Sequence, residues 1–191
     1  RLLVVLLLAL VLGLTLALPW LKTPVLLALS NGLAVLGVIV LIRAGQVSFG
    51  HALFACLAGY GVAFAGRAWH LDALLLIALG TAGATAAGAL IGVFMVRYRG
   101  IFFGMLNLAF SMVLYAVLGK FGAFTGGTDG LRFDRPGFGF VQMEREGFET
   151  ALLLLALVLA VLAGMAVQRY FASVNGQALA AIKTNETRLE Y

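Results

Sequence analysis

A series of long apolar runs constrains this chain more than any other feature. A membrane-spanning helix needs roughly 20 mostly apolar residues. Five runs approach or exceed that length, and a sixth is more polar at its start. We therefore predict an all-α fold, a polytopic transmembrane helix bundle of about five to six spans. The expected spans are Leu2–Leu18, Val25–Ile42, Ala44–Gly66, Ala73–Val96, Ile101–Gly119 and Ala151–Val167.

Composition supports the bilayer as the solvent of this protein. Hydrophobic residues make up 63% of the chain and charged residues 11%, whereas soluble domains carry about 25% charged residues. A soluble fold could not hide so much apolar surface. The net charge of +5 comes from basic residues scattered at the ends of the runs, where they flank a membrane. The chain is therefore expected in the lipid bilayer, with no nucleic-acid partner.

Two of the runs allow a second interpretation. Residues 2–18 follow a basic residue and resemble the apolar part of a signal peptide, although the run is long and lacks a clear cleavage site. Residues 44–66 open with polar side chains, so this span could begin as a broken or re-entrant helix instead of a plain one.

Charge and alternation of the spans predict the orientation. Basic residues near helix ends favour a cytoplasmic N-terminus. The polar stretch 120–150 then forms an external loop, and the segment 169–191 is cytoplasmic. We treat residues 1–191 as a single transmembrane domain.

Polar side chains inside the spans are the candidates for a solute pathway, because such residues are costly in lipid and often functional. Asn107, Ser111 and Tyr115 recur every four residues and form one line on a helix. Ser48 and His51, three residues apart, would share a helix face. These residues either line a pathway or form hydrogen bonds between helices, and the candidates are Gln46, Ser48, His51, Asn107, Ser111 and Tyr115.

Small residues in the fourth run indicate close helix packing. They recur every four residues, a spacing that lets another backbone approach. Glycines that line a translocation path are the alternative. The positions are Gly80, Ala84, Gly88 and Gly92.

Motifs of enzymes and metal sites are missing from the sequence. The two histidines have no carboxylate at ligand spacing, and no phosphate-binding loop with its lysine occurs. We predict no catalytic residues, no metal and no cofactor, so any ATP must be used by another polypeptide. No acidic residue lies within the spans, which disfavours a proton- or sodium-driven carrier.

Four ordered blocks resemble one family, the permeases of branched-chain amino acid ABC transporters of the LivM type. The blocks are Gly45–Phe54 with Gly59-Tyr60, Arg97–Tyr115, Thr125–Leu131 and Gly176–Glu186. Asn107 stands where the family pattern has Thr, and Ala180 where it has a basic residue. Family chains are longer and continue with further spans, so this sequence is expected to be a fragment.

The resemblance implies a binding-protein-dependent importer in the bacterial inner membrane. Its partners would be a second related permease subunit, two cytoplasmic ATP-binding subunits and an extracytoplasmic solute-binding protein. The solute would be a branched-chain or related amino acid, with urea or an amide as the alternative. The segment that couples to the ATPases would include Gly176, Leu179, Ile182, Lys183 and Glu186.

Two other functions remain open at this point. A carrier that works without ATP and a membrane subunit that transports nothing would both share the apolar runs.

Overall fold

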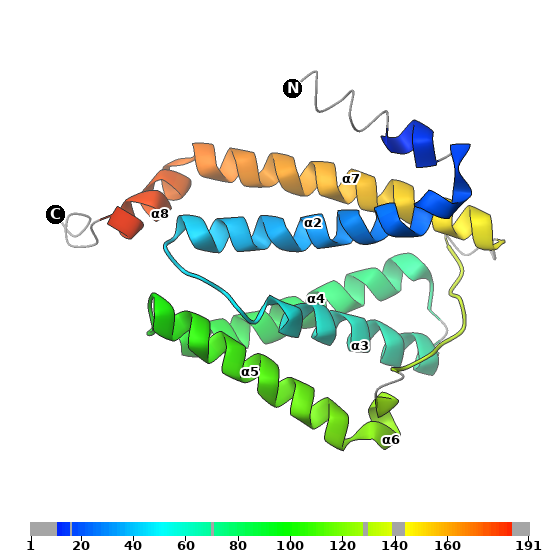
Figure 1. Cartoon of the computed structure of the whole chain (residues 1–191), viewed down its shortest axis with the longest axis horizontal. Coiled ribbons are helices and arrows are strands. Elements are labelled where there is room, and N and C mark those ends of the chain that lie inside the picture. The colour runs from blue at the N-terminus through cyan, green and yellow to red at the C-terminus, as the bar shows by residue number, and fades with distance from the viewer. Residues whose placement is uncertain (1–10, 16, 70, 128–129, 139–143, 185–191) are drawn as a thin grey trace. The chain divides into compact units, whose positions relative to one another are not determined.

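The computed structural model describes residues 11–15, 17–69, 71–127, 130–138 and 144–184, with the backbone alone for 180–184. The elements in these ranges are helical (Figure 1): η1 (Pro19–Leu21), α2 (Lys22–Arg43), α3 (His51–Trp69), α4 (Ala73–Met95), α5 (Ile101–Lys120), α6 (Gly122–Thr125), α7 (Arg145–Ala172) and α8 (Val174–Thr184). Most of the run Leu2–Leu18 lies outside the described residues.

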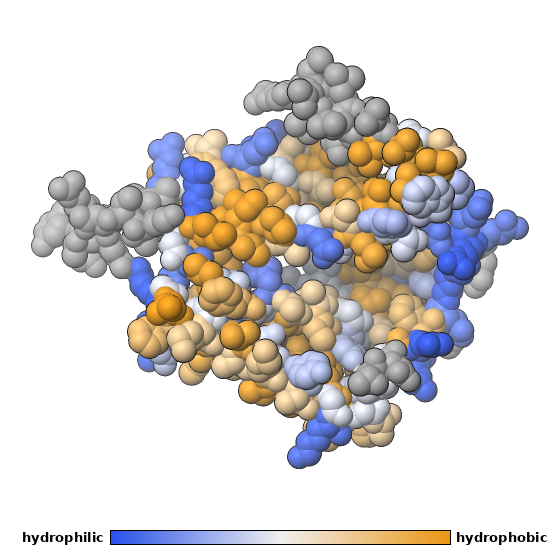
Figure 2. Space-filling model, in the orientation of Figure 1, coloured by the Kyte–Doolittle hydropathy of each residue, from blue (hydrophilic) through white to orange (hydrophobic). Residues whose placement is uncertain are grey.

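Five helical stretches are long and apolar enough to cross a membrane: Pro19–Arg43, α3, α4, α5 and α7. This result confirms the prediction of an all-α polytopic bundle. Apolar side chains cover the lengths of the helices, and hydrophilic side chains gather toward their ends (Figure 2). Leu90 on α4, for example, is 76% exposed. Such surfaces are stable against lipid or another apolar subunit and not against water.

The chain divides into two compact units. Unit 1 comprises residues 1–40 and 143–178, and its main elements are most of α2 and the whole of α7. Unit 2 comprises residues 41–142 and 179–191, and contains α3, α4, α5 and α6.

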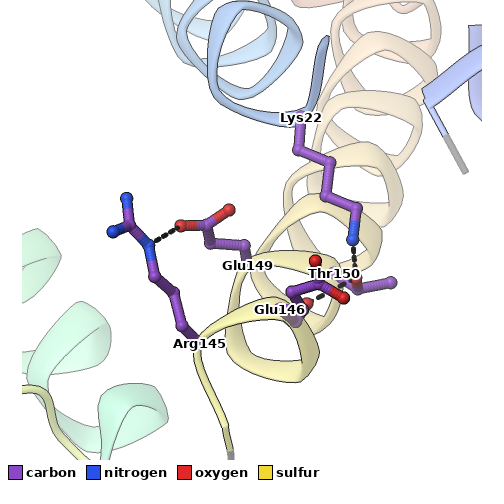
Figure 3. A network of polar contacts seen from close by, with 5 residues as sticks. All are labelled: Lys22, Arg145, Glu146, Glu149 and Thr150. Carbon is purple, nitrogen blue, oxygen red and sulfur yellow. Dashed lines mark hydrogen bonds and ion pairs between the residues drawn. The ribbon is translucent and has the colours of Figure 1, made fainter. Parts of the chain in front are cut away.

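A buried lysine joins the two long helices of unit 1 (Figure 3). Lys22, the first residue of α2, is only 8% exposed. Its Nζ donates a hydrogen bond to Thr150 Oγ1 on α7 at 3.0 Å. The Thr150 hydroxyl in turn donates to the Glu146 carbonyl at 2.7 Å. A buried charge needs polar partners, so this contact fixes one end of α2 against α7.

Helix α7 begins at Arg145, upstream of the start that the apolar run alone predicts at Ala151. The Arg145 guanidinium pairs with Glu149 one turn later, with Nε 2.8 Å from Oε1 (Figure 3). Pairs at this spacing stabilise a helix modestly. Residues 145–150, which were predicted to belong to the loop 120–150, are therefore helical.

In unit 2, α3 and α4 form an antiparallel helical hairpin. Gly80 lies beside Ala58 and Val62, while Gly88, two turns later, lies beside the earlier residue Phe54. A Cβ atom at Gly80 would sit 2.5 Å from Val62 Cγ2 and 3.0 Å from the Ala58 carbonyl oxygen. A Cβ at Gly92 would meet no atom within 4 Å. The predicted line of small residues therefore contacts α3 at Gly80 and Gly88. Ala84, which lies between these two glycines, is half-buried.

This difference between two glycines of one helix gives a matched test. Gly80→Leu should destabilise the protein by about 1–3 kcal/mol, because overpacking forces the helices apart. Gly92→Leu adds the same side chain to open space and should be tolerated. Reversible unfolding in mixed micelles measures both. Equal stability of the two variants would contradict the described packing.

Candidate functional site

The segment between α2 and α3 is not helical. After Arg43 the chain turns, with hydrogen bonds from Ala44 N and Gln46 N to the Leu41 carbonyl at 3.0 and 2.9 Å. Gly45 has φ +76°, a conformation that glycine adopts readily at the end of a helix. Helix α3 then begins at His51. The expected span 44–66 therefore has a broken opening, which was one of its two predicted forms.

Residues 46–50, here called the inserted segment, lie along α5. Gln46 Oε1 accepts a hydrogen bond from Gly100 N at 3.0 Å. A Cβ atom at Gly104 would stand 2.8 Å from the Val47 carbonyl oxygen. Gly50 is buried, and a Cβ there would overlap the Asn107 backbone carbonyl. The two backbones approach this closely because both contact points are glycine.

The contacts follow one face of α5. Gly100, Gly104 and Asn107 are separated by four and three residues, which places them on the same side of a helix. At about 1.5 Å of rise per residue, the inserted segment follows α5 for roughly 10 Å. Helix α3 therefore starts beside the interior of α5 and not beside its end.

Three of the predicted pathway residues meet at this junction. Asn107 is 3% exposed, and its Nδ2 donates a hydrogen bond to Ser48 Oγ at 2.5 Å. Ser48 Oγ also lies 3.1 Å from His51 Nδ1. Ser48 precedes α3, so it does not share a helix face with His51, contrary to the prediction. The two side chains are nevertheless in contact. Gln46 anchors the same segment at its start.

The polar line of α5 leaves the junction as it continues. Ser111 is half-buried, and Tyr115 is 77% exposed. Asn107 is thus the residue of this line that contacts the inserted segment. Its Oδ1 is buried and has no hydrogen-bond partner among the described atoms. Leaving a buried carbonyl unsatisfied costs about 1–3 kcal/mol.

A second candidate site lies where α7 turns into α8. Ser173 between them is extended, with φ −77° and ψ 164°. Its Oγ donates to the Tyr170 carbonyl at 2.6 Å and accepts a hydrogen bond from Gly176 N at 3.3 Å, as a helix cap does. Gly176 is buried, and a Cβ there would overlap the Tyr170 carbonyl. The start of α8 is therefore fixed to the end of α7.

The other predicted coupling residues are less fully described. Leu179 is half-buried. Ile182 and Lys183 lie in the helical backbone of α8, and Glu186 lies outside the described residues. Across the described part of the chain, no group of three or more His, Cys, Asp or Glu side chains could hold a metal ion.

Sequence reasoning missed two glycines of the junction, Gly50 and Gly104. A signal was present for Gly104, which stands between Phe103 and Met105 in an apolar and aromatic run. Such a glycine in a span often marks a close backbone contact.

Five helices that are long and apolar enough to cross a membrane, one of them preceded by a non-helical segment, define a multi-pass membrane protein. Residues 21–191 match the model of one family, described as the permease component of branched-chain amino acid transport systems. The chain belongs to this family. No curated protein and no solved structure matches it.

The junction predicts different effects for glycines of one helix. Gly104→Ala would press on the Val47 carbonyl and should loosen the inserted segment by about 1–3 kcal/mol. Gly119→Ala is the control, because a Cβ there meets nothing within 4 Å. Hydrogen exchange at the amides of Val47 to Gly50 should rise in the first variant and stay unchanged in the second. Unchanged exchange in both would contradict the close contact.

Proposed function

We propose that this chain is a membrane-spanning permease subunit of an ATP-driven ABC importer for branched-chain or related amino acids. The observation that carries this proposal is the family match, which extends over residues 21–191. We place the protein in the bacterial inner membrane. Its proposed partners are a second related permease, two cytoplasmic ATP-binding subunits and an extracytoplasmic solute-binding protein.

The proposed use of ATP by separate subunits rests on the sequence, which contains no phosphate-binding loop with its lysine. Force must then reach the spans through a contact with those subunits. The corner of Ser173 and Gly176 supports α8 as that contact. Because the corner leaves no room for a side chain at Gly176, a displacement of α8 would move the end of α7 with it. Such rigid-body coupling is a known form of switching between states.

The proposed solute pathway passes the junction of α3, α5 and the inserted segment. Ser48, His51 and Asn107 form a hydrogen-bonded group there, and non-helical backbone is tolerated at membrane depth where it borders protein or a cavity. The neutral amide and hydroxyl groups would suit a solute with both donors and acceptors. Helices α2, α3, α4 and α5 contain no carboxylate that could bind a driving cation, and the two carboxylates of α7, Glu146 and Glu149, lie in its first two turns.

The test of this proposal is uptake by the assembled transporter in liposomes, with the solute-binding protein outside and nucleotide enclosed. Leucine uptake should require enclosed ATP and persist when an ionophore removes ion gradients. The same vesicles should be offered urea. Uptake that follows an ion gradient without ATP would replace the proposal with a secondary carrier.

Coupling is tested in the same vesicles with a matched pair. Gly176→Ala should reduce solute-stimulated ATP hydrolysis at least tenfold, because its Cβ overlaps the α7 backbone. Gly164→Ala within α7 adds a methyl group to open space and should behave as the wild type. Normal stimulation in Gly176→Ala would exclude the α7–α8 corner as the coupling element.

A further inference from the structure

A small cleft lies between α3 and the loop that follows α6. Its volume is about 260 Å³. We call it the α3 cleft, and its lining residues are Cys56, Gly59, Tyr60, Ala63, Gly130 and Leu131. The four residues from α3 follow one another by three, one and three positions, so they share one face of the helix. A buried thiol behaves as a small apolar group, so the side chains of this lining are mainly apolar.

Helix α4 does not fill the cleft, because it packs on the other side of α3. Gly80 of α4 lies beside Ala58 and Val62, and the helical period places these two positions opposite the cleft. A Cβ atom added at Gly59 would meet no neighbouring atom within 4 Å, and the same holds for Gly130 in the facing loop. The two walls of the cleft therefore stand apart across empty space.

Local contacts hold the loop wall of the cleft in place. The Phe133 ring packs on Gly66 so closely that a Cβ there would lie 2.8 Å from the ring. The Gly137 carbonyl accepts a hydrogen bond from Ala73 N, at the start of α4, at 2.8 Å. The other wall is α3 itself. The cleft is thus formed before a ligand arrives, which lowers the cost of binding.

A cation lies one turn beyond the cleft on the same face of α3. Arg67 follows Ala63 by four residues, or about 6 Å along the helix axis, and its side chain is exposed. It borders a wider hollow that shares Gly130 and Leu131 with the cleft. Among the described residues Arg67 has no ion-pair partner. An arginine fork suits a carboxylate, so one small molecule could place an apolar group in the cleft and an anionic group at Arg67.

The size of the cleft indicates the class of that molecule. Sites that enclose whole drug-sized ligands measure roughly 300–1,000 Å³. A cleft of about 260 Å³ suits a short aliphatic group and is too small for a helix. An α-amino acid with a branched aliphatic side chain carries such a group beside a carboxylate. Urea has neither an aliphatic group nor a carboxylate.

We propose that the α3 cleft holds the side chain of the transported amino acid, that Arg67 binds its carboxylate, and that Gly59 sets the size of side chain that fits. This inference rests on the proposed function. Phe133 belongs to the predicted external loop and packs on Gly66, so this end of α3 is the external one. The cleft then lies between the outside and the junction at His51, and it selects the solute before the junction.

The test uses Cys56, the one cysteine of the sequence, as a reporter of occupancy. The transporter is assembled with its ATPases in nanodiscs of phosphatidylcholine and treated with N-ethylmaleimide, and mass spectrometry follows the peptide that contains Cys56. Leucine at roughly ten times its dissociation constant should slow the reaction ~10-fold, and urea should not slow it. 3-Methylbutylamine, which is leucine without its carboxylate, should bind about 2- to 5-fold more weakly than leucine. Arg67→Gln should remove that difference.

A matched pair of variants tests the role of Gly59. Gly59→Ala adds a methyl group to the cleft and should weaken protection by leucine at least ~10-fold. The effect on valine, whose side chain is one methylene shorter, should be smaller. Gly61→Ala is the control, because its Cβ would lie 3.9 Å from Gly80 Cα, in ordinary contact with α4, and it does not line the cleft. Both variants make the same change in helix propensity.

Each result decides the question. If leucine fails to protect Cys56 in a transporter that takes up leucine with ATP, the inference is overturned and the proposed function stands. A Cys56 that reacts only after detergent replaces the lipid shows a cleft filled by lipid and also overturns the inference. Equal protection in the Gly59 and Gly61 variants overturns the role of Gly59. A wild type with neither uptake nor protection rejects the proposed function itself.

Discussion

The contact between the inserted segment and α5 is the constraint on which unit 2 depends. Peptide groups in lipid must find partners within the protein, and residues 46–50 give up helical hydrogen bonds inside a membrane domain. They are tolerated because they lie against α5, where Gly104 and Gly50 permit backbone contact and Gln46 and Asn107 supply polar partners. The position of α3 follows from this contact, and α4 follows from α3 through Gly80.

Much of the fold could be predicted from sequence, because the bilayer imposes a length and a polarity on each span. The spans of α2, α4 and α5 were predicted to within a few residues of their observed bounds. Other features depend on contacts distant in sequence. The early start of α7 reflects Arg145, Glu149 and the bond from Lys22, none of which an apolar run contains. The break before His51 was foreseen only as an alternative, because polar residues at a span's opening fit both a helix and a turn.

The candidate site was predictable by residue type and not by arrangement. Polar residues in apolar spans identified Ser48, His51 and Asn107, and the structure places their side chains together. Periodicity alone grouped Asn107 with Ser111 and Tyr115, whereas the structure separates them by exposure. The glycines of the junction and the Ser173–Gly176 corner owe their roles to backbone proximity, which spacing does not reveal. Whether these residues line a pathway stays a prediction.

The central claim is that the inserted segment is bound to α5 through Ser48 and Asn107. A double-mutant cycle with Ser48→Ala and Asn107→Ala, read by reversible unfolding in mixed micelles, tests it directly. Side-chain hydrogen bonds between membrane helices average about 0.6 kcal/mol and reach about 1.7. The contact predicts a coupling energy of at least ~0.6 kcal/mol between the two changes. Additive effects, within about 0.3 kcal/mol, would show that the two side chains do not interact and would contradict the described junction.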